Sequence, residues 1–154
     1  MTPMTESASR RVVLAASALW RALVIVAGLH LYWLLGGRWA VHAASGGAYS
    51  DVTPALRAYS AVVAILLVVG CLVVRARVGL WTAPASDRIV RIASWMLTAA
   101  LALAALLNFT ASTNVERFAI APFVLMLAVL ALVVADSGTT RHRLHPPHRT
   151  LPSQ

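Results

Sequence analysis

The sequence predicts an all-α, polytopic membrane protein with four transmembrane helices in an antiparallel up-down bundle. The main observation is four segments of about twenty mostly apolar residues, at 17–36, 55–74, 89–108 and 115–135. A helix that rises about 1.5 Å per residue needs that length to cross a hydrocarbon core of about 30 Å. Composition agrees, because 60% of the residues are hydrophobic and only 12% are charged. No separate soluble domain fits beside these spans.

The arginines are distributed unequally between the two sides of the spans, and this predicts their orientation. All 13 basic residues are arginine. The side that holds both termini carries nine of them: Arg10, Arg11, Arg75, Arg77, Arg88, Arg91, Arg141, Arg143 and Arg149. Because positive residues concentrate in cytoplasmic connections, we expect both termini in the cytoplasm. Arginine in place of lysine, with abundant Ala, Val and Leu, is typical of high-GC bacteria, so we expect a multi-pass protein of the bacterial plasma membrane.

The first span contains a charged residue, Arg21, whose depth in the membrane depends on where the hydrocarbon core begins. If the hydrocarbon core begins near Ser17, Arg21 lies about one turn inside it and can snorkel to the headgroups beside the interfacial Trp20. A competing interpretation is a cleaved twin-arginine export signal around Arg10 and Arg11. Arg21 interrupts the apolar region that such a signal requires, so we expect a retained helix.

The remaining elements follow in order. We expect an outer loop after the first span, with Trp39 in the interface, and a helix start at Thr53-Pro54, where threonine caps and proline needs no N–H. Trp81 is expected in the opposite headgroup layer. Either Ser86 or Asp87 is expected to cap the third helix.

A short polar turn over residues 109–114 predicts that the third and fourth helices pack as antiparallel neighbours. Pro122 is expected to bend the fourth helix. The transmembrane domain is therefore expected over residues 11–136, between two cytoplasmic segments, 1–10 and 137–154, whose composition predicts disorder.

His30 and Trp33 lie three residues apart, and Gly37 follows seven residues after His30, so on a helix the three share one stripe. One interpretation is that His30 faces the bundle interior and binds a ligand or moves a proton. The other is that His30 makes one packing hydrogen bond, with Gly37 allowing close helix approach. We favour packing, because no carboxylate lies in the apolar core of any span to form a relay.

The few acidic residues, cysteines and histidines of the spans argue against three functions of known four-helix membrane proteins. A proton-coupled multidrug antiporter needs an acidic residue within the apolar core of a span, and none is present in the four apolar cores. A thiol oxidoreductase needs paired cysteines, whereas Cys71 is the single cysteine. A haem held between two histidines needs two ligands, whereas His30 is the only histidine in a span. We therefore expect no catalytic residues and no cofactor.

Two features suggest ligands outside the spans. The net charge of +8 flanks apolar segments, so we expect anionic lipids at the cytoplasmic face, and no nucleic acid, as its partner. In the tail, His142, His145 and His148 recur every three residues and would share one face of a polyproline II helix, which makes them candidate metal ligands. A basic tail on anionic lipid is the favoured interpretation.

The segment His30-Leu31-Tyr32-Trp33-Leu34-Leu35-Gly36-Gly37-Arg38-Trp39 resembles the uncharacterised bacterial membrane family catalogued as domain of unknown function 3995. The sequence Glu116-Arg117-Phe118, leading through Pro122 into the last span, is also similar to that family. The similarity covers roughly residues 15–136. The resemblance implies a small four-helix membrane protein without an assigned activity, and it transfers no catalytic residues.

The sequence thus favours a non-enzymatic accessory or structural subunit, which forms homo-oligomers or joins a membrane complex through Ala-rich helix faces. Two alternatives stay open. One is a small oligomeric carrier or channel lined by His30 and Asn108. The other is a membrane enzyme that acts on a lipid or quinone near His30 and Trp33.

Overall fold

The computed structural model describes the backbone of residues 3–41, 50–111 and 113–144, and the side chains of 10–41, 50–111 and 113–137. The regular structure within these residues is helical. It consists of α1 (Pro3–Leu34), α3 (Pro54–Arg77), α4 (Asp87–Phe109), the short π-helix η1 (Glu116–Ile120) and α5 (Ala121–Leu144). Four segments are long and apolar enough to cross a membrane: Arg10–Leu34, Pro54–Arg77, Asp87–Phe109 and Glu116–Ser137. The four expected spans are therefore present as helices.

Helix ends in the connections follow from local chemistry. Thr53 occupies the N-cap of α3 and accepts a hydrogen bond from the Leu56 N–H (3.2 Å) through its Oγ1, with Pro54 in the first position. Ser86 occupies the N-cap of α4, but its side chain makes no capping hydrogen bond. The expected cap at Thr53 is confirmed.

The end of α1 lies two residues before the predicted end of the first span, because two glycines terminate the helix. Gly36 has φ +98°, and its N–H donates to the Trp33 carbonyl (3.0 Å), while the Gly37 N–H donates to the Tyr32 carbonyl (2.9 Å). This is the Schellman arrangement, in which a residue of left-handed conformation follows the last helical turn. Gly79, with φ +76°, ends α3 in the same way.

The start of the fourth helical segment is irregular beside Pro122, where the sequence predicts a bend. Pro122 has no N–H, so the carbonyl of Phe118 lacks its usual α-helical donor. The backbone there has π-helical spacing, and the Ala121 N–H donates to the Glu116 carbonyl, five residues earlier. The local irregularity at proline is therefore a π-helical turn, a common way to accommodate such a disruption.

Both terminal helices extend beyond the expected boundaries of the transmembrane domain. Residues 3–10 belong to α1 and residues 137–144 to α5, and the disorder that composition predicts for 1–10 and 137–154 stays a prediction. The composition rule concerns whether a segment can bury enough apolar surface to fold alone. Extending an existing helix adds a hydrogen bond for each residue without a new nucleus, so a polar segment continues the helix.

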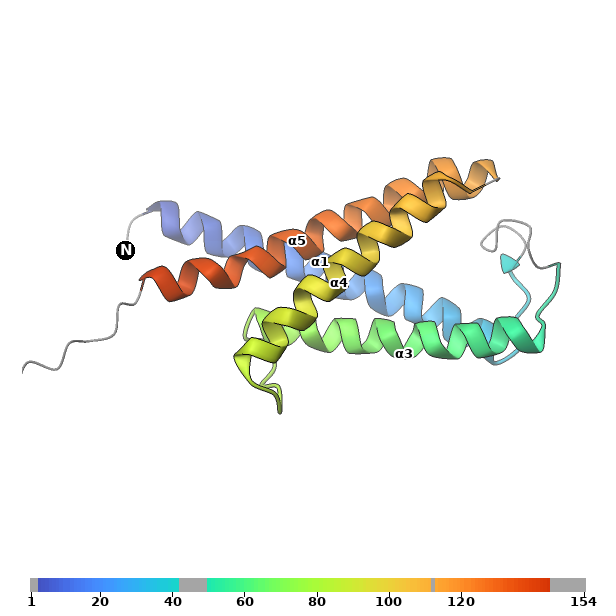
Figure 1. Cartoon of the computed structure of the whole chain (residues 1–154), viewed down its shortest axis with the longest axis horizontal. Helices are drawn as coiled ribbons and strands as arrows, with labels where there is room; N and C mark the ends of the chain where they lie inside the picture. The colour runs from blue at the N-terminus through green and yellow to red at the C-terminus, as the bar shows by residue number, and fades with distance from the viewer. Residues whose placement is uncertain (1–2, 42–49, 112, 145–154) are drawn as a thin grey trace, which may run out of the picture.

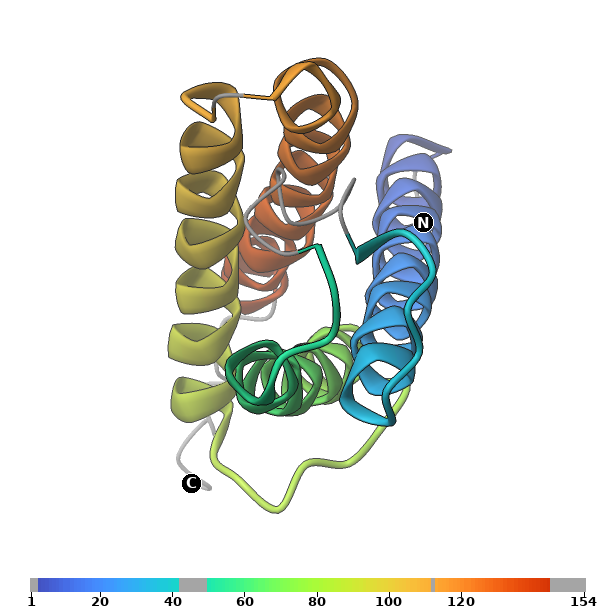
Figure 2. The ribbon, with the colours of Figure 1, turned by 90° about the vertical axis from the view of Figure 1, so that its right-hand side faces the viewer.

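The four helices are arranged as two packed pairs. Each helix runs opposite to the one before it in Figure 1, and α1 packs mainly on α3 while α4 packs mainly on α5. Figure 2 shows α1 and α4 on opposite sides of the molecule, with α3 and α5 between them. The two pairs lie close together at the end with the chain termini and diverge toward the other end (Figure 1).

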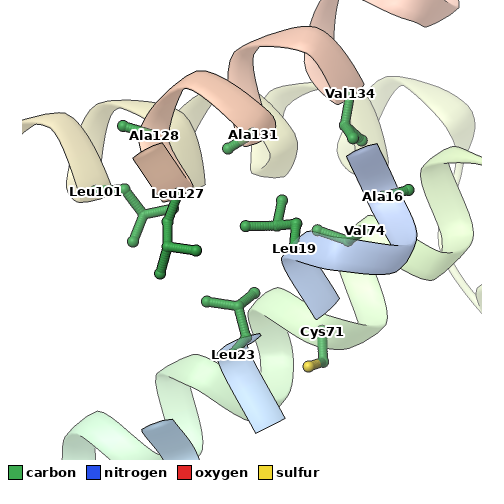
Figure 3. Packing of buried hydrophobic residues seen from close by; sticks show 10 residues of the cluster. All are labelled: Ala16, Leu19, Leu23, Cys71, Val74, Leu101, Leu127, Ala128, Ala131 and Val134. Carbon is green, nitrogen blue, oxygen red and sulfur yellow. The ribbon is translucent and has the colours of Figure 1, made fainter. Parts of the chain in front are cut away.

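One apolar core joins the two pairs. It contains Ala16, Leu19, Leu23, Cys71, Val74, Leu101, Leu127, Ala128, Ala131 and Val134, and Figure 3 shows their side chains converging from all four helices. Arg77 adds a polar link, because its Nη2 donates to the Ala135 carbonyl of α5 (2.8 Å). Large apolar side chains outside this core are exposed on every helix. The four apolar helices therefore fit a multi-pass membrane protein.

Candidate functional site

The end of the α1–α3 pair away from the chain termini carries an aromatic cluster of His30, Trp33 and Tyr59. The His30 ring meets the Trp33 ring edge to face, with centroids 5.1 Å apart and planes at 84°. It also contacts the Tyr59 ring of α3, at 5.9 Å and 67°. The spacing of three residues places His30 and Trp33 on one face of α1. That pair could be identified from its spacing in the sequence, whereas Tyr59 was missed.

Hydrogen bonds connect this cluster to the loop that follows α1. The buried Trp33 indole donates through Nε1 to the Trp39 carbonyl (2.9 Å). The Trp39 N–H donates to the Tyr32 hydroxyl (3.4 Å), while the Trp39 ring is exposed. Arg38 and Asp51 form an exposed ion pair (2.8 Å) between the two ends of the loop. The exposed Trp39 ring fits its expected interfacial position.

Gly37 does not contribute to a helix-packing stripe, because α1 ends before it. A Cβ at Gly37 would overlap the Tyr32 ring, so the close approach there is to an aromatic side chain of the preceding helix end. A Cβ at Gly36 would lie 2.7 Å from Nη2 of Arg57 on α3. The two glycines thus allow the loop to fold back over its own helix and over the start of α3.

The His30 side chain contacts two aromatic rings, and its Nδ1 makes no hydrogen bond to the described residues. Its Nδ1 is buried and has no hydrogen-bond partner among the described residues, although the residue as a whole is half-buried. A buried polar atom without a partner costs about 1–3 kcal/mol. The packing interpretation predicted a hydrogen bond from His30 to a neighbouring helix, and the contacts made by His30 are instead ring contacts.

Asn108 lies on the other helix pair and is not brought to His30. Its Nδ2 donates to the Ala104 carbonyl of its own helix (2.7 Å). The α4 helix that carries it packs chiefly on α5, on the opposite side of the molecule from α1 (Figure 2). His30 and Asn108 therefore do not line a common polar path within the described chain.

The opposite end of the α1–α3 pair carries a second cluster, formed by Trp20, Arg21 and Arg75. The guanidinium carbons of Arg21 and Arg75 lie 5.6 Å and 5.8 Å from the centroid of the Trp20 ring. Cys71 donates a hydrogen bond through Sγ to the Trp20 carbonyl (3.2 Å). Trp20 and Arg21 were paired from sequence, but Arg75 was missed, because it is 55 positions after Trp20 and approaches only through the packing of α1 and α3.

The other predicted site residues lie apart from these clusters. Trp81 is exposed in the connection between α3 and α4. His145 and His148 lie outside the described residues, and of His142 only the helical backbone is described. Within the described chain, no group of three or more His, Cys, Asp or Glu residues could hold a metal ion. The metal hypothesis for the tail stays a prediction.

Comparisons with known proteins place the chain in a family. The model of a family described as a protein of unknown function, DUF3995, matches residues 23–119. That range includes the aromatic cluster at the end of α1 and continues into η1. Neither the curated proteins nor the solved structures contain a match. Since the match covers more than half of the sequence, the chain belongs to the DUF3995 family of proteins of unknown function.

Proposed function

We propose that this protein is a non-enzymatic subunit of the bacterial plasma membrane that assembles with other membrane-spanning helices. In this proposal its four helices cross in up-down order with both termini in the cytoplasm. Nine of the 13 arginines on the side of the termini support that orientation. The apolar outer surface of the helices supports a position within the bilayer.

The observation that carries the proposal is the way the polar side chains of α4 are satisfied. The side chains of Ser94, Thr98 and Asn108 each donate to a carbonyl of their own helix, at 2.8, 2.9 and 2.7 Å. Side chains bonded in this way are not arranged toward a shared substrate or water-filled path. The polar side chains of α4 therefore favour a packing role, whereas the buried His30 Nδ1 on α1 and Ser60 Oγ on α3 have no hydrogen-bond partner among the described residues.

The surface of α4 is the face on which assembly is most readily tested. Of the four spans, α4 has the smallest buried share, 11% of its most apolar stretch of 18 residues. Met96 is 67% exposed, and the exposed Ala100 lies one turn further along. Small residues on a membrane helix let a second helix approach closely. By contrast, the buried Ala128 and Ala131 of α5 already pack within the chain.

Cross-linking in the native membrane tests this proposal. In a Cys71→Ser background, a Met96→Cys variant should form cross-linked species, whereas an Ile25→Cys variant, 73% exposed on α1, should not. Mass spectrometry of the product then identifies a second copy or a partner. Equal cross-linking at both positions, together with a monomeric mass in mild detergent, would contradict assembly through α4.

The buried Nδ1 of His30 favours a second candidate function, the binding of a small molecule by a carrier or an enzyme near the aromatic cluster. A ligand with a donor or acceptor for that nitrogen would offset its desolvation. A His30→Gln variant separates the two functions. Unchanged stability with lost transport or turnover supports the second candidate, whereas altered stability without loss of any activity supports the packing role.

A further inference from the structure

A pocket of about 160 Å³ lies between α1 and α3 at the level of Trp20. Its lining includes Trp20, Val24, Val68, Cys71, Leu72 and Arg75. Apart from Arg75, these side chains present apolar surface. Val24, Val68 and Leu72 are also exposed, so the pocket opens on the outer surface of the helix pair, where lipid chains lie in a membrane.

Two positive charges meet beside this pocket. Arg21 and Arg75 are exposed, and both guanidinium groups lie against the ring of Trp20. Among the described side chains the ion pair is that of Arg38 with Asp51, on the loop after α1, so neither arginine is neutralised by a described carboxylate. Two cations around one ring repel each other, and an anion between them would be stabilised by both.

We propose that this pocket binds one anionic phospholipid molecule, with an acyl chain against Val24, Val68 and Leu72 and the phosphate beside Arg21 and Arg75. Arginine suits this role because its planar guanidinium binds phosphate oxygens with two parallel hydrogen bonds. Tryptophan is enriched at the level of lipid headgroups. A pocket that is apolar below and cationic at its edge matches the two parts of a phospholipid.

The depth of the pocket favours a lipid over a soluble anion. It lies within helix segments that are long and apolar enough to span the membrane, Arg10–Leu34 and Pro54–Arg77. Soluble phosphate would contact only the arginines, whereas a lipid would contact both the arginines and the apolar wall. The arginine-rich side of the spans is also the side on which anionic lipids attract basic residues near the membrane, at about 1 kcal/mol per residue.

Lipid retention by purified variants tests the proposal. The full-length protein is placed in nanodiscs of phosphatidylcholine with phosphatidylglycerol, extracted, and weighed by native mass spectrometry. The wild type should retain one phosphatidylglycerol, and Arg75→Ala should weaken retention about fivefold, the equivalent of about 1 kcal/mol. Arg88→Ala, which removes an exposed charge from the start of α4, is the matched control and should retain the lipid.

A second pair of variants tests the apolar part without changing charge. Val68→Trp fills the pocket from its half-exposed edge and should prevent retention, whereas Val69→Trp adds the same ring at a half-exposed position outside the pocket lining and should not. Circular dichroism confirms that each variant is folded. Equal retention by the Val68 and Val69 variants would overturn the proposal, as would equal losses for Arg75→Ala and Arg88→Ala.

Cys71 provides an independent reporter, because it is the single cysteine of the chain and lines the pocket. Phosphatidylglycerol should slow the reaction of Cys71 with a small apolar maleimide in the wild type and in Arg88→Ala, but not in Arg75→Ala. Free inorganic phosphate should give no such protection. Protection by phosphate alone would replace the lipid with a soluble anion, and protection that is independent of Arg75 would contradict the site.

Discussion

Leu19 lies at the centre of the core that joins the two helix pairs, and its replacement by alanine tests the packing directly. The side chain is 0% exposed and belongs to the cluster contributed by all four helices (Figure 3). In water-soluble cores, Leu→Ala substitutions cost about 3–5 kcal/mol. Part of that cost is the lost benefit of removing three side-chain carbon atoms from water, at about 0.8 kcal/mol for each carbon.

The transfer part should largely vanish in a membrane, because separated helices remain in hydrocarbon. The cost of the cavity and of lost van der Waals contacts remains, so we expect Leu19→Ala to lower the free energy of unfolding by about 1–2.5 kcal/mol. The same substitution at Leu66, which is 63% exposed on α3, should cost less than about 0.5 kcal/mol.

Reversible unfolding in mixed detergent micelles, followed by circular dichroism over a range of SDS fractions, measures both variants. The comparison is internal, since the two substitutions remove the same atoms from helices of one protein. Equal destabilisation at Leu19 and Leu66 would refute the reasoning, because it would mean that Leu19 gains no more stability from packing within the chain than Leu66 does.

Two further predictions concern the backbone and the orientation. Gly36→Ala should lower the free energy of unfolding by about 1–2 kcal/mol, because φ is +98° there; Gly28→Ala, inside α1 with open space at its Cβ, should be neutral or stabilising by up to about 1 kcal/mol. In intact cells of a cysteine-free background, Asn114→Cys should react with a membrane-impermeant maleimide and Ala85→Cys only after lysis. The reverse labelling would invert the proposed orientation.

Most of the secondary structure could be predicted from sequence because length and hydropathy are sufficient criteria for a membrane span. Thr53 and Pro54 likewise defined the start of α3 by local chemistry alone. The end of α1 was placed two residues too late, because Leu35 and Gly36 continue the apolar pattern while the backbone at Gly36 is already left-handed. The pattern of apolar residues does not indicate such a change of backbone conformation.

The candidate sites were predicted only where their residues are neighbours in sequence. His30 with Trp33, and Trp20 with Arg21, were both identified from spacing along α1. Their partners Tyr59 and Arg75 were not, because both lie on α3 and approach through helix packing. Asn108 was grouped with His30 for polarity alone, and the structure places it on the other helix pair.

Length and hydropathy alone dictate that the chain forms four apolar helices, because the need to satisfy every backbone hydrogen bond in a bilayer leaves few other conformations for such segments. Which faces of those helices meet was decided only in the tertiary structure. Leu19 and Ile25 are equally apolar, yet one is buried and the other exposed. Lipid and protein core are similar solvents for both, so hydropathy cannot separate them, and shape complementarity between helices decides.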